Sequence, residues 1–198
     1  MPPPEDRQAP GFRHLGDRLC FEGWRIQLVE ASFAAPDGER FTRDVVRHPG
    51  AVAVVPVTDR ASVLLVRQYR GPIDAHLLEI PAGTRDVDGE TPQATAAREL
   101  IEEVGVRAGV IRPLVDMYNS PGFCDERTSL FLATDLEPCA AEPDGIEERH
   151  MEVVEVPLAD VDGLVASGQL VDGQTILGLL LAREALAGHL GGGEPPSP

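Results

Sequence analysis

Residues 83–106 contain the feature that most limits what this chain can be, a run of carboxylates on a short predicted helix. The segment reads GTRDVDGETPQATAARELIEEVGV. Thr91 is placed to cap a helix, Pro92 suits the first helical position because its missing N–H costs nothing there, and Gly105 is a typical C-terminal stop. The sequence therefore predicts a helix that begins after Thr91 and ends at Gly105.

The acidic residues of this helix point to a divalent cation. An apolar stripe that can pack on a sheet consists of Ala97, Leu100, Ile101 and Val104. Glu99, Glu102 and Glu103 are spaced three and four apart, so they project together from another part of the surface. Like charges at this spacing destabilise a helix by a few tenths of a kcal/mol per pair, roughly, unless a cation neutralises them. Oxygen ligands suit Mg²⁺ or Mn²⁺, although the three glutamates alone would also fit a solvated acidic face.

Composition excludes several other classes of protein. A net charge of −16 and a pI near 4.6 argue against nucleic acid and anionic membranes as partners, because phosphate groups would be repelled. All 17 basic residues are arginine, which excludes lysine chemistry. Cys20, Cys124 and Cys139 are widely spaced and form no zinc or disulfide pattern. The N-terminus has no apolar signal region and no stretch is apolar enough to span a membrane, so we expect a cytoplasmic protein.

The order of elements predicts an α/β protein. Residues 1–18 and 191–198 have the composition of disordered tails. Residues 19–48 are expected to form an N-terminal antiparallel β element, with strands at 24–29 and 41–46 joined through a turn at Pro36, Asp37 and Gly38. The remaining domain, 49–190, has strands predicted at 51–57, 63–69, 77–80, 113–118, 129–134 and 153–156, and helices at 159–167 and 174–187. Strands interspersed with helices favour a mixed sheet flanked by helices.

The acidic helix resembles the signature of the Nudix hydrolases, enzymes that split a diphosphate linked to another moiety. Gly83, Glu90 and the run 98–106 carry the match. The family pattern has five residues between this glycine and the first glutamate, whereas six intervene here. We interpret the difference as a loop insertion that Gly89 absorbs with backbone angles closed to other residues; Asp88 is close enough to substitute for Glu90. The resemblance implies an α/β/α sandwich.

Residues outside the helix resemble the ADP-ribose pyrophosphatase branch of that family. Pro121 lies sixteen residues beyond Gly105, within the sequence SPGFCDE, and a proline at that distance is similar to the mark of this branch. The other resembling segments are 22–24, 43–52, 66–70 and 77–83. The branch implies hydrolysis of ADP-ribose to AMP and ribose 5-phosphate with Mg²⁺ or Mn²⁺ as cofactor.

The resemblance assigns a role to individual residues. The metal ligands would be the carbonyl of Ala82 and the carboxylates of Glu99 and Glu103, with Glu102 in support and Arg98 orienting a glutamate. Arg70 would bind the diphosphate, and Glu79, Pro121 and Gly122 lie in the resembling segments expected to contact substrate. The base that activates water would be Glu148 or, second, Glu147, with Glu126 and Glu152 still open.

The branch also implies a homodimer. Trp24 lies where the branch stacks an aromatic ring on adenine, and Arg43 where it places the opposite face of that sandwich, partly from the neighbouring subunit. We therefore expect exchange of N-terminal strands between two copies. A core tryptophan is the alternative reading of Trp24, the only tryptophan in the chain.

Two alternative functions remain open at this point. The first is a Nudix hydrolase with another substrate, such as a nucleotide sugar, a dinucleoside polyphosphate or an oxidised nucleotide. The second is a catalytically silent module that senses a nucleotide. Such modules typically lose the box glutamates, whereas this chain retains Glu99, Glu102 and Glu103.

Overall fold

The computed structural model describes residues 11–141, 143, 145, 146 and 148–190. The expected C-terminal tail and the first ten residues of the expected N-terminal tail lie outside this part. The chain divides into two compact units, and each is described by itself. Unit 1 comprises the chain up to Pro49 together with Ser120–Glu126, and unit 2 comprises Gly50–Asn119 and the chain from Arg127 onward.

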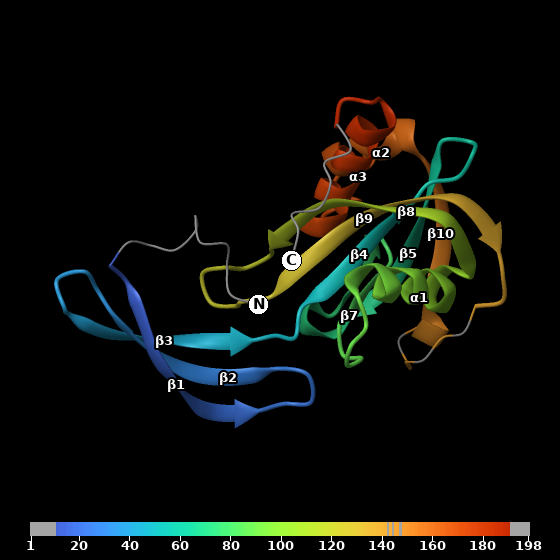
Figure 1. Ribbon diagram of the computed structural model, residues 1–198. Helices are drawn as coiled ribbons and strands as arrows, with labels where there is room; N and C mark the ends of the chain where they lie inside the picture. Colours follow the sequence, from blue (N-terminus) through green and yellow to red (C-terminus); the bar gives the residue numbers. More distant parts are fainter. Residues whose placement is uncertain (1–10, 142, 144, 147, 191–198) are drawn as a thin grey trace. The chain divides into compact units, whose positions relative to one another are not determined.

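Unit 1 is built on a three-stranded antiparallel sheet of order β1-β2-β3 (Figure 1). Its strands are β1 (Arg13–Glu22), β2 (Gln27–Ala34) and β3 (Arg40–Arg47). The expectation of a tail up to residue 18 is wrong for residues 13–18, which form the first half of β1. Every residue of β1 is exposed, so the strand has no buried face to give an apolar alternation. Backbone pairing with β2 and surface side-chain contacts, such as the ion pair of Asp17 with Arg47, hold it in place.

The first hairpin turn also differs from the expectation. The strand predicted from Trp24 begins only at Gln27, because the N–H of Gly23 bonds the carbonyl of Ile26 at 2.8 Å and closes a turn over these residues. The second turn, at 36–38, connects β2 and β3 as predicted.

The loop Ser120–Glu126 packs against β3 in unit 1, although the sequence places it in the domain 49–190. Cys124 forms a parallel bridge with Val46. The N–H of Val46 bonds the carbonyl of Phe123 at 2.8 Å, and the N–H of Asp125 bonds the carbonyl of Val46 at 3.1 Å. Backbone pairing of this kind has no signature in the composition of the loop.

Unit 2 contains two sheets. The four-stranded sheet has the order β7-β4-β9-β8 and is mixed, since β4 and β9 are parallel and the other pairs antiparallel. Its strands are β4 (Ala51–Pro56), β7 (Ala82–Thr84), β8 (Val106–Tyr118) and β9 (Arg127–Pro138). The antiparallel sheet β10-β5-β6 contains β5 (Ser62–Arg70), β6 (Ala75–Glu79) and β10 (Glu152–Pro157). Strand β8 begins well before the predicted residue 113, because most residues of its first half are not buried and give no periodic signal.

Helices cover both faces of the four-stranded sheet, which confirms the α/β class (Figure 1). Helix α1 (Pro92–Val104) packs with Val52 and Val54 of β4 on one side. Helix α3 (Gly173–Leu186) packs with β4 on the other side, where Ala53 and Val55 belong to a second cluster that also contains Val161 of α2 (Val161–Ala166). The alternation along β4 follows from the two-residue period of a strand that is buried on both faces. Short 3-10 turns occur at Gly71–Ile73, Glu148–His150 and Leu158–Asp160. Among the described residues, no helix has the length and apolar character needed to cross a membrane.

Candidate active site

The ends of α1 are fixed by the residues that predict them. The Thr91 hydroxyl accepts a hydrogen bond from the N–H of Ala94 at 3.2 Å. Gly105 adopts the left-handed conformation at φ 64°, and its N–H bonds the carbonyl of Ile101 at 3.2 Å. The predicted caps are therefore confirmed. The stripe against the sheet is centred on Ala96, Leu100 and Val104, whereas Ala97 and Ile101 are only half-buried.

Two of the glutamates on α1 are buried against the backbone of β7. Glu99 is 5% exposed and Glu103 is 7% exposed, so they do not form a solvated acidic face. Glu103 Oε2 accepts a hydrogen bond from the N–H of Ala82 at 3.0 Å. The Glu99 carboxylate lies so close to Gly83 that a Cβ there would be 1.9 Å from Oε1. Both carboxylates therefore lie against the backbone of the strand segment Ala82–Thr84.

Burial makes these two carboxylates hard to ionise. Desolvation raises the pKa of Glu99 to about 7, with Arg98 acting against the shift and Glu102 and Glu148 adding to it. Desolvation, and next the charge of Glu99, raise the pKa of Glu103 well above its usual value. A bound cation would stabilise the ionised form of these two carboxylates, because it replaces the interactions with water that burial removes.

Arg98 connects the glutamates of the helix. Its Nη1 lies 2.9 Å from Glu99 Oε1 and donates to Glu102 Oε2 at 2.7 Å. Its Nη2 donates to Glu90 Oε2 at 3.5 Å. Desolvation alone would lower the pKa of Arg98, but Glu99 and Glu102 outweigh it and the net pKa is raised. One guanidinium therefore orients the carboxylates that it touches.

The loop before α1 accommodates its extra residue at Gly89. This glycine has φ 79°, a conformation that other residues rarely adopt, as predicted. Glu90 accepts a hydrogen bond from the Thr95 hydroxyl at 2.9 Å in addition to the contact with Arg98. Asp88 is exposed. Glu90 therefore takes part in the hydrogen-bond network of Arg98, whereas Asp88 lies at the surface.

Arg70 is held by a buried carboxylate. Glu79 is 2% exposed and accepts from Arg70 Nε at 3.1 Å, from Arg70 Nη2, and from Gln68 Nε2 at 2.6 Å. Desolvation lowers the pKa of Arg70, but Glu79 raises it more, and Glu103 and Asp172 add to the increase. Glu79 thus fixes an arginine that interacts electrostatically with Glu103 of α1.

Helix α3 contributes a contact that the sequence analysis missed. Thr175 is fully buried, and its hydroxyl accepts from the N–H of Ile80 at 3.0 Å while donating to Asp172 Oδ2 at 2.6 Å. Asp172 also caps the helix by accepting from the N–H of Thr175 at 2.8 Å. The capping role was readable from an aspartate three residues before a threonine at the start of a predicted helix. The bond to Ile80, 95 residues earlier in the chain, was not.

The candidate bases differ in what surrounds them. Glu148 begins the short turn Glu148–His150 and lies near enough to raise the pKa of both Glu99 and Glu103. Glu147 lies outside the described residues. Glu152 begins β10 and forms an ion pair with Arg67 at 3.5 Å. Glu126 belongs to unit 1.

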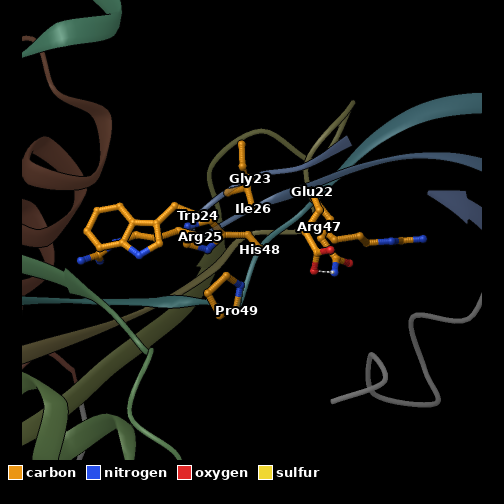
Figure 2. A pocket seen from close by; sticks show the side chains of 9 residues that line it. Glu22, Gly23, Trp24, Arg25, Ile26, Arg47, His48 and Pro49 are labelled. Carbon is orange, nitrogen blue, oxygen red and sulfur yellow. Dashed lines mark hydrogen bonds between the residues drawn. The ribbon is translucent and has the colours of Figure 1, made fainter. Parts of the chain in front are cut away.

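Trp24 is a surface residue and not part of the core. It is 91% exposed, and the Arg25 guanidinium lies 4.8 Å from the centre of its ring. A pocket of about 270 Å³ opens beside it (Figure 2), lined by Glu22, Gly23, Trp24, Arg25, Ile26, Gln27, Arg47, His48 and Pro49. Arg43 lies instead over the ring of Phe41, at 4.8 Å from its centre. One chain therefore does not bring Trp24 and Arg43 together.

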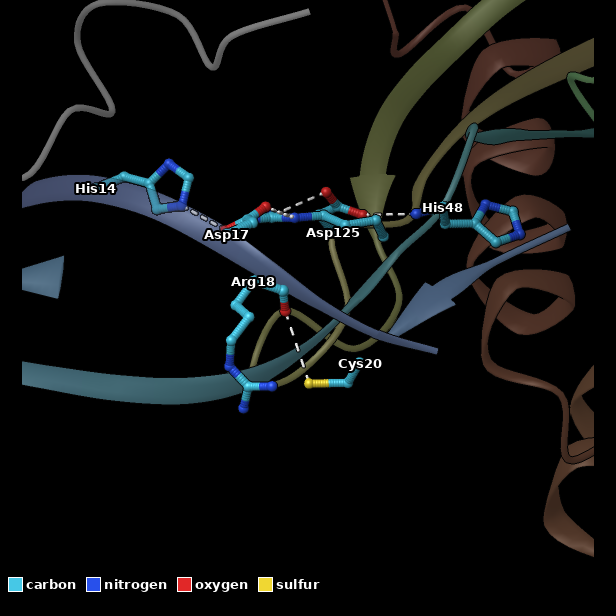
Figure 3. Close-up of polar contacts among 7 residues, drawn as sticks. His14, Asp17, Arg18, Cys20, His48 and Asp125 are labelled. Atoms are coloured by element: carbon cyan, nitrogen blue, oxygen red, sulfur yellow. Dashed lines mark hydrogen bonds and ion pairs between the residues drawn. The ribbon is translucent and has the colours of Figure 1, made fainter. Parts of the chain in front are cut away.

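Pro121 and Gly122 occupy an exposed turn of the loop Ser120–Glu126. The loop is tied to the sheet of unit 1 by side chains that the sequence analysis missed (Figure 3). Arg47 donates to Asp125 at 3.0 Å and to both oxygens of Asp17 at 2.9 and 3.0 Å. The N–H of His48 donates to Asp125 at 2.9 Å. Because Arg47 also lines the pocket beside Trp24, the pocket wall and the loop share one residue.

The residues around β7 fit a hard divalent cation. No group of three acidic, histidine or cysteine side chains within the described ranges is arranged to hold a metal by itself. Mg²⁺, however, is usually bound by one or two carboxylates together with water and substrate phosphates. Glu99 and Glu103 are desolvated carboxylates with raised pKa values beside the Ala82 backbone, which matches that donor set.

Comparisons with known proteins agree with this geometry. The NUDIX domain matches residues 47–176. The ADP-ribose pyrophosphatase of Bacillus subtilis strain 168 is 39% identical over 174 residues, covering 87% of this chain and 94% of that protein. The protein of the same name from Mycobacterium tuberculosis strain H37Rv is 40% identical over 177 residues, covering 89% and 86%. A crystal structure of an "ADP compounds hydrolase" superposes with a TM-score of 0.79 over 93% of this chain and 100% of that one, at 24% identity, and supports the fold. The chain belongs to the Nudix family.

Proposed function

We propose that the protein is an ADP-ribose pyrophosphatase that hydrolyses ADP-ribose to AMP and ribose 5-phosphate with the help of Mg²⁺ or Mn²⁺. The observation that carries the proposal is the similarity to two ADP-ribose pyrophosphatases at 39% and 40% identity over more than four fifths of each chain. The buried carboxylate pair on α1 supplies the chemistry that such a reaction needs.

The residues that would hold the cations are Glu99, Glu103 and the carbonyl of Ala82, with Glu102 in support. When bound, the divalent cations polarise the diphosphate and lower the pKa of a water molecule. Arg98 keeps Glu99 and Glu102 in position through its contacts at 2.9 and 2.7 Å. The Gly83 backbone allows the close approach of Glu99, since any side chain there would overlap its carboxylate.

Glu148 is our choice for the group that takes a proton from the attacking water. Its charge acts on both Glu99 and Glu103, which supports a place beside the metal ligands. The oxygen of that water would bond to one phosphorus as the bridging P–O bond breaks, and the leaving phosphate keeps the electron pair. Glu147, outside the described residues, is the second choice.

Arg70 would bind the diphosphate. Its bonds to Glu79 use Nε and Nη2, and among the described residues no bond is made by Nη1, which leaves one edge of the guanidinium for a phosphate oxygen. Glu79 would then act on substrate through Arg70. Pro121 and Gly122 would contact substrate from their exposed turn.

A homodimer would complete the adenine site. Trp24 is 91% exposed, and Arg43 of the same chain lies over Phe41, so the opposite face of an adenine sandwich would come from a second copy. Strand β1 supports exchange of N-terminal strands, because all ten of its residues are exposed and it forms an edge of its sheet. The net charge of −16 and three free cysteines favour a cytoplasmic enzyme that binds neither nucleic acid nor membranes.

A panel of substrates tests the proposal. Purified protein is incubated with ADP-ribose, ADP-glucose, GDP-mannose, NADH and diadenosine polyphosphates, with and without Mg²⁺, and products are separated by chromatography. We expect AMP and ribose 5-phosphate to form fastest from ADP-ribose and only with metal. Faster turnover of another compound would indicate a Nudix hydrolase with that compound as substrate. No turnover of any compound would favour a nucleotide sensor.

A further inference from the structure

Arg85 is a partly buried arginine whose guanidinium has no partner among the described residues. Its Nε is buried and makes no hydrogen bond. The Nε of Arg98 is also unsatisfied, but Arg98 contacts Glu99 and Glu102 through Nη1, whereas Arg85 contacts no carboxylate among the described residues. A buried N–H donor without an acceptor is costly, on the order of 1–3 kcal/mol, and is uncommon in native proteins. The Nε–H of Arg85 is therefore available to donate a hydrogen bond to an acceptor outside the described residues.

The lack of a carboxylate partner for Arg85 is informative because its Nε is buried, whereas Arg107, which also has no ion pair within the described part of the chain, is exposed. Acidic residues outnumber arginines by 33 to 17. Arg47, Arg70, Arg98 and Arg127 each form an ion pair with a carboxylate. Arg85 forms no such pair within the described part of the chain, although an aspartate follows it directly. A free guanidinium in so acidic a protein has the charge to bind an anion.

The backbone places Arg85 on the same face as the glutamate site. Its N–H bonds the carbonyl of Gly50 at 3.0 Å, which continues the pairing of β7 with β4 by one residue. Side chains two apart on a strand point to the same face. At Gly83 that face is covered by the Glu99 carboxylate, so Arg85 emerges beside it, two residues further along.

Gly50 leaves the space that the Arg85 side chain uses. A Cβ at Gly50 would lie 3.8 Å from Arg85 Cδ and 3.9 Å from Nη1, so the guanidinium extends over a residue without a side chain. Gly50 has φ 99°, a conformation that disfavours any replacement. The guanidinium is thus held by packing over backbone and not by a carboxylate.

We infer that Arg85 binds a phosphate group of the substrate. This inference rests on the proposed function for the identity of the ligand. The Nε–H and one Nη–H of a guanidinium match two oxygens of a phosphate. A phosphate there would satisfy the buried Nε–H, and Arg85 would offset the repulsion between the diphosphate and the carboxylates of Glu99 and Glu103.

Titration of inorganic diphosphate in the presence of Mg²⁺, followed by calorimetry, tests the inference without turnover of ADP-ribose. We compare the wild type with Arg85→Gln and with Arg107→Gln, which removes an exposed arginine of β8 as a matched loss of charge. Arg85→Gln should weaken diphosphate binding about 10- to 100-fold, the effect of losing hydrogen bonds to a charged group. Arg107→Gln should bind as the wild type does. Equal affinity of Arg85→Gln and wild type, or no diphosphate binding by the wild type, would overturn the inference.

A second variant separates charge from geometry and guards against misfolding. Arg85→Lys keeps the positive charge but lacks the two parallel N–H donors of a guanidinium. Its affinity for diphosphate should therefore fall between those of the wild type and Arg85→Gln. In steady-state assays with ADP-ribose, Arg85→Gln should raise KM more than it lowers kcat, because the contact is already made in the bound substrate. A variant that loses only kcat would speak against a binding role.

The two proposals fail in different ways. A wild type that binds diphosphate through Arg85 but does not hydrolyse ADP-ribose would refute the proposed function and support the inference. A wild type that hydrolyses ADP-ribose, with Arg85→Gln unchanged in diphosphate affinity and KM, would refute the inference alone.

Discussion

The carboxylate of Glu99 occupies the space in which a side chain at Gly83 would begin. A Cβ built on Gly83 would lie 1.9 Å from Oε1 and 2.6 Å from Oε2 of Glu99. Gly83 is paired with Val52 in the sheet and has little freedom to retreat. A glycine is therefore required at this position because the Glu99 carboxylate lies against its backbone.

Replacing Gly83 by alanine should displace the Glu99 carboxylate and disable the site. We expect turnover of ADP-ribose to fall by at least about 100-fold, since misplacement by about an ångström has effects of that size. The free energy of unfolding should fall by about 1–3 kcal/mol, as for other overpacked interiors. Gly163→Ala is the control, because a Cβ at this position on α2 meets nothing within 4 Å. Wild-type turnover by Gly83→Ala would remove Glu99 from the metal ligands.

Glu103→Gln should separate catalysis from folding. The amide keeps an oxygen that can accept the N–H of Ala82, but loses the negative charge that a cation needs. Turnover should fall by orders of magnitude. Because burial raises the pKa of Glu103, a neutral side chain should leave the metal-free protein at neutral pH at least as stable as the wild type. Steady-state assays with ADP-ribose measure the turnover, and thermal unfolding with and without Mg²⁺ measures the stability and the effect of the metal on it, with the exposed Glu137→Gln as control. Normal turnover in Glu103→Gln would refute the metal assignment.

Thr175→Val should loosen the segment that leads to Ala82. Valine has the shape of threonine without the hydroxyl, so the buried N–H of Ile80 loses its acceptor. The expected cost is about 1–3 kcal/mol in the free energy of unfolding, measured by urea denaturation. If the bond also positions Ala82, the Mg²⁺ concentration for half-maximal activity should rise in Thr175→Val and return toward the wild-type value in Thr175→Ser. Equal stability of Thr175→Val and wild type would show that the bond carries no net stabilisation.

Local signals in the sequence were sufficient for the acidic helix and for the strands buried on both faces. Thr91, Pro92 and Gly105 act through backbone bonds within a few residues, so their effect is readable without the fold. Strand β4 is apolar throughout and appears almost as predicted. Burial of Glu99 and Glu103 was not readable, because it depends on how β7 lies under α1.

The contacts that sequence analysis missed join distant parts of the chain. Ile80 and Thr175 are 95 residues apart, and Arg47 and Asp125 are 78 apart. Strand β1 lies at an edge of its sheet and all its residues are exposed. Its sequence therefore has no alternation of apolar and polar residues that would predict a strand. The sequence does not single out Arg85, because a buried guanidinium N–H without an acceptor is visible only in the folded structure.

The ion pair between Asp17 and Arg47 should make unit 1 sensitive to acid. Desolvation raises the pKa of Asp17, but hydrogen bonds from His14 and Arg47 outweigh it and the net pKa is lowered. A carboxylate with a lower pKa in the folded than in the unfolded state adds stability above its unfolded pKa, about 3.9, and loses it as pH falls through the folded pKa. Asp17→Asn should therefore lower the free energy of unfolding at pH 6. At a pH well below the folded pKa of Asp17, the substitution should have no such effect. Since the pair is partly exposed, the difference should be at most about 1 kcal/mol.

Hydrogen exchange of single amides can detect the local effect of Asp17→Asn, which is small compared with the free energy of unfolding of the whole chain. The N–H of Val46 is bonded to Phe123, next to the Arg47 contacts with Asp17 and Asp125, so its protection reports on the loop. At pH 6 the Val46 amide should exchange several-fold faster in Asp17→Asn than in the wild type, since Arg47 loses one of its two carboxylate partners. Asp59→Asn, in an exposed turn of unit 2, should leave this amide unchanged. Equal protection of Val46 in Asp17→Asn and wild type would mean that Asp125 alone holds Arg47 and the loop in place.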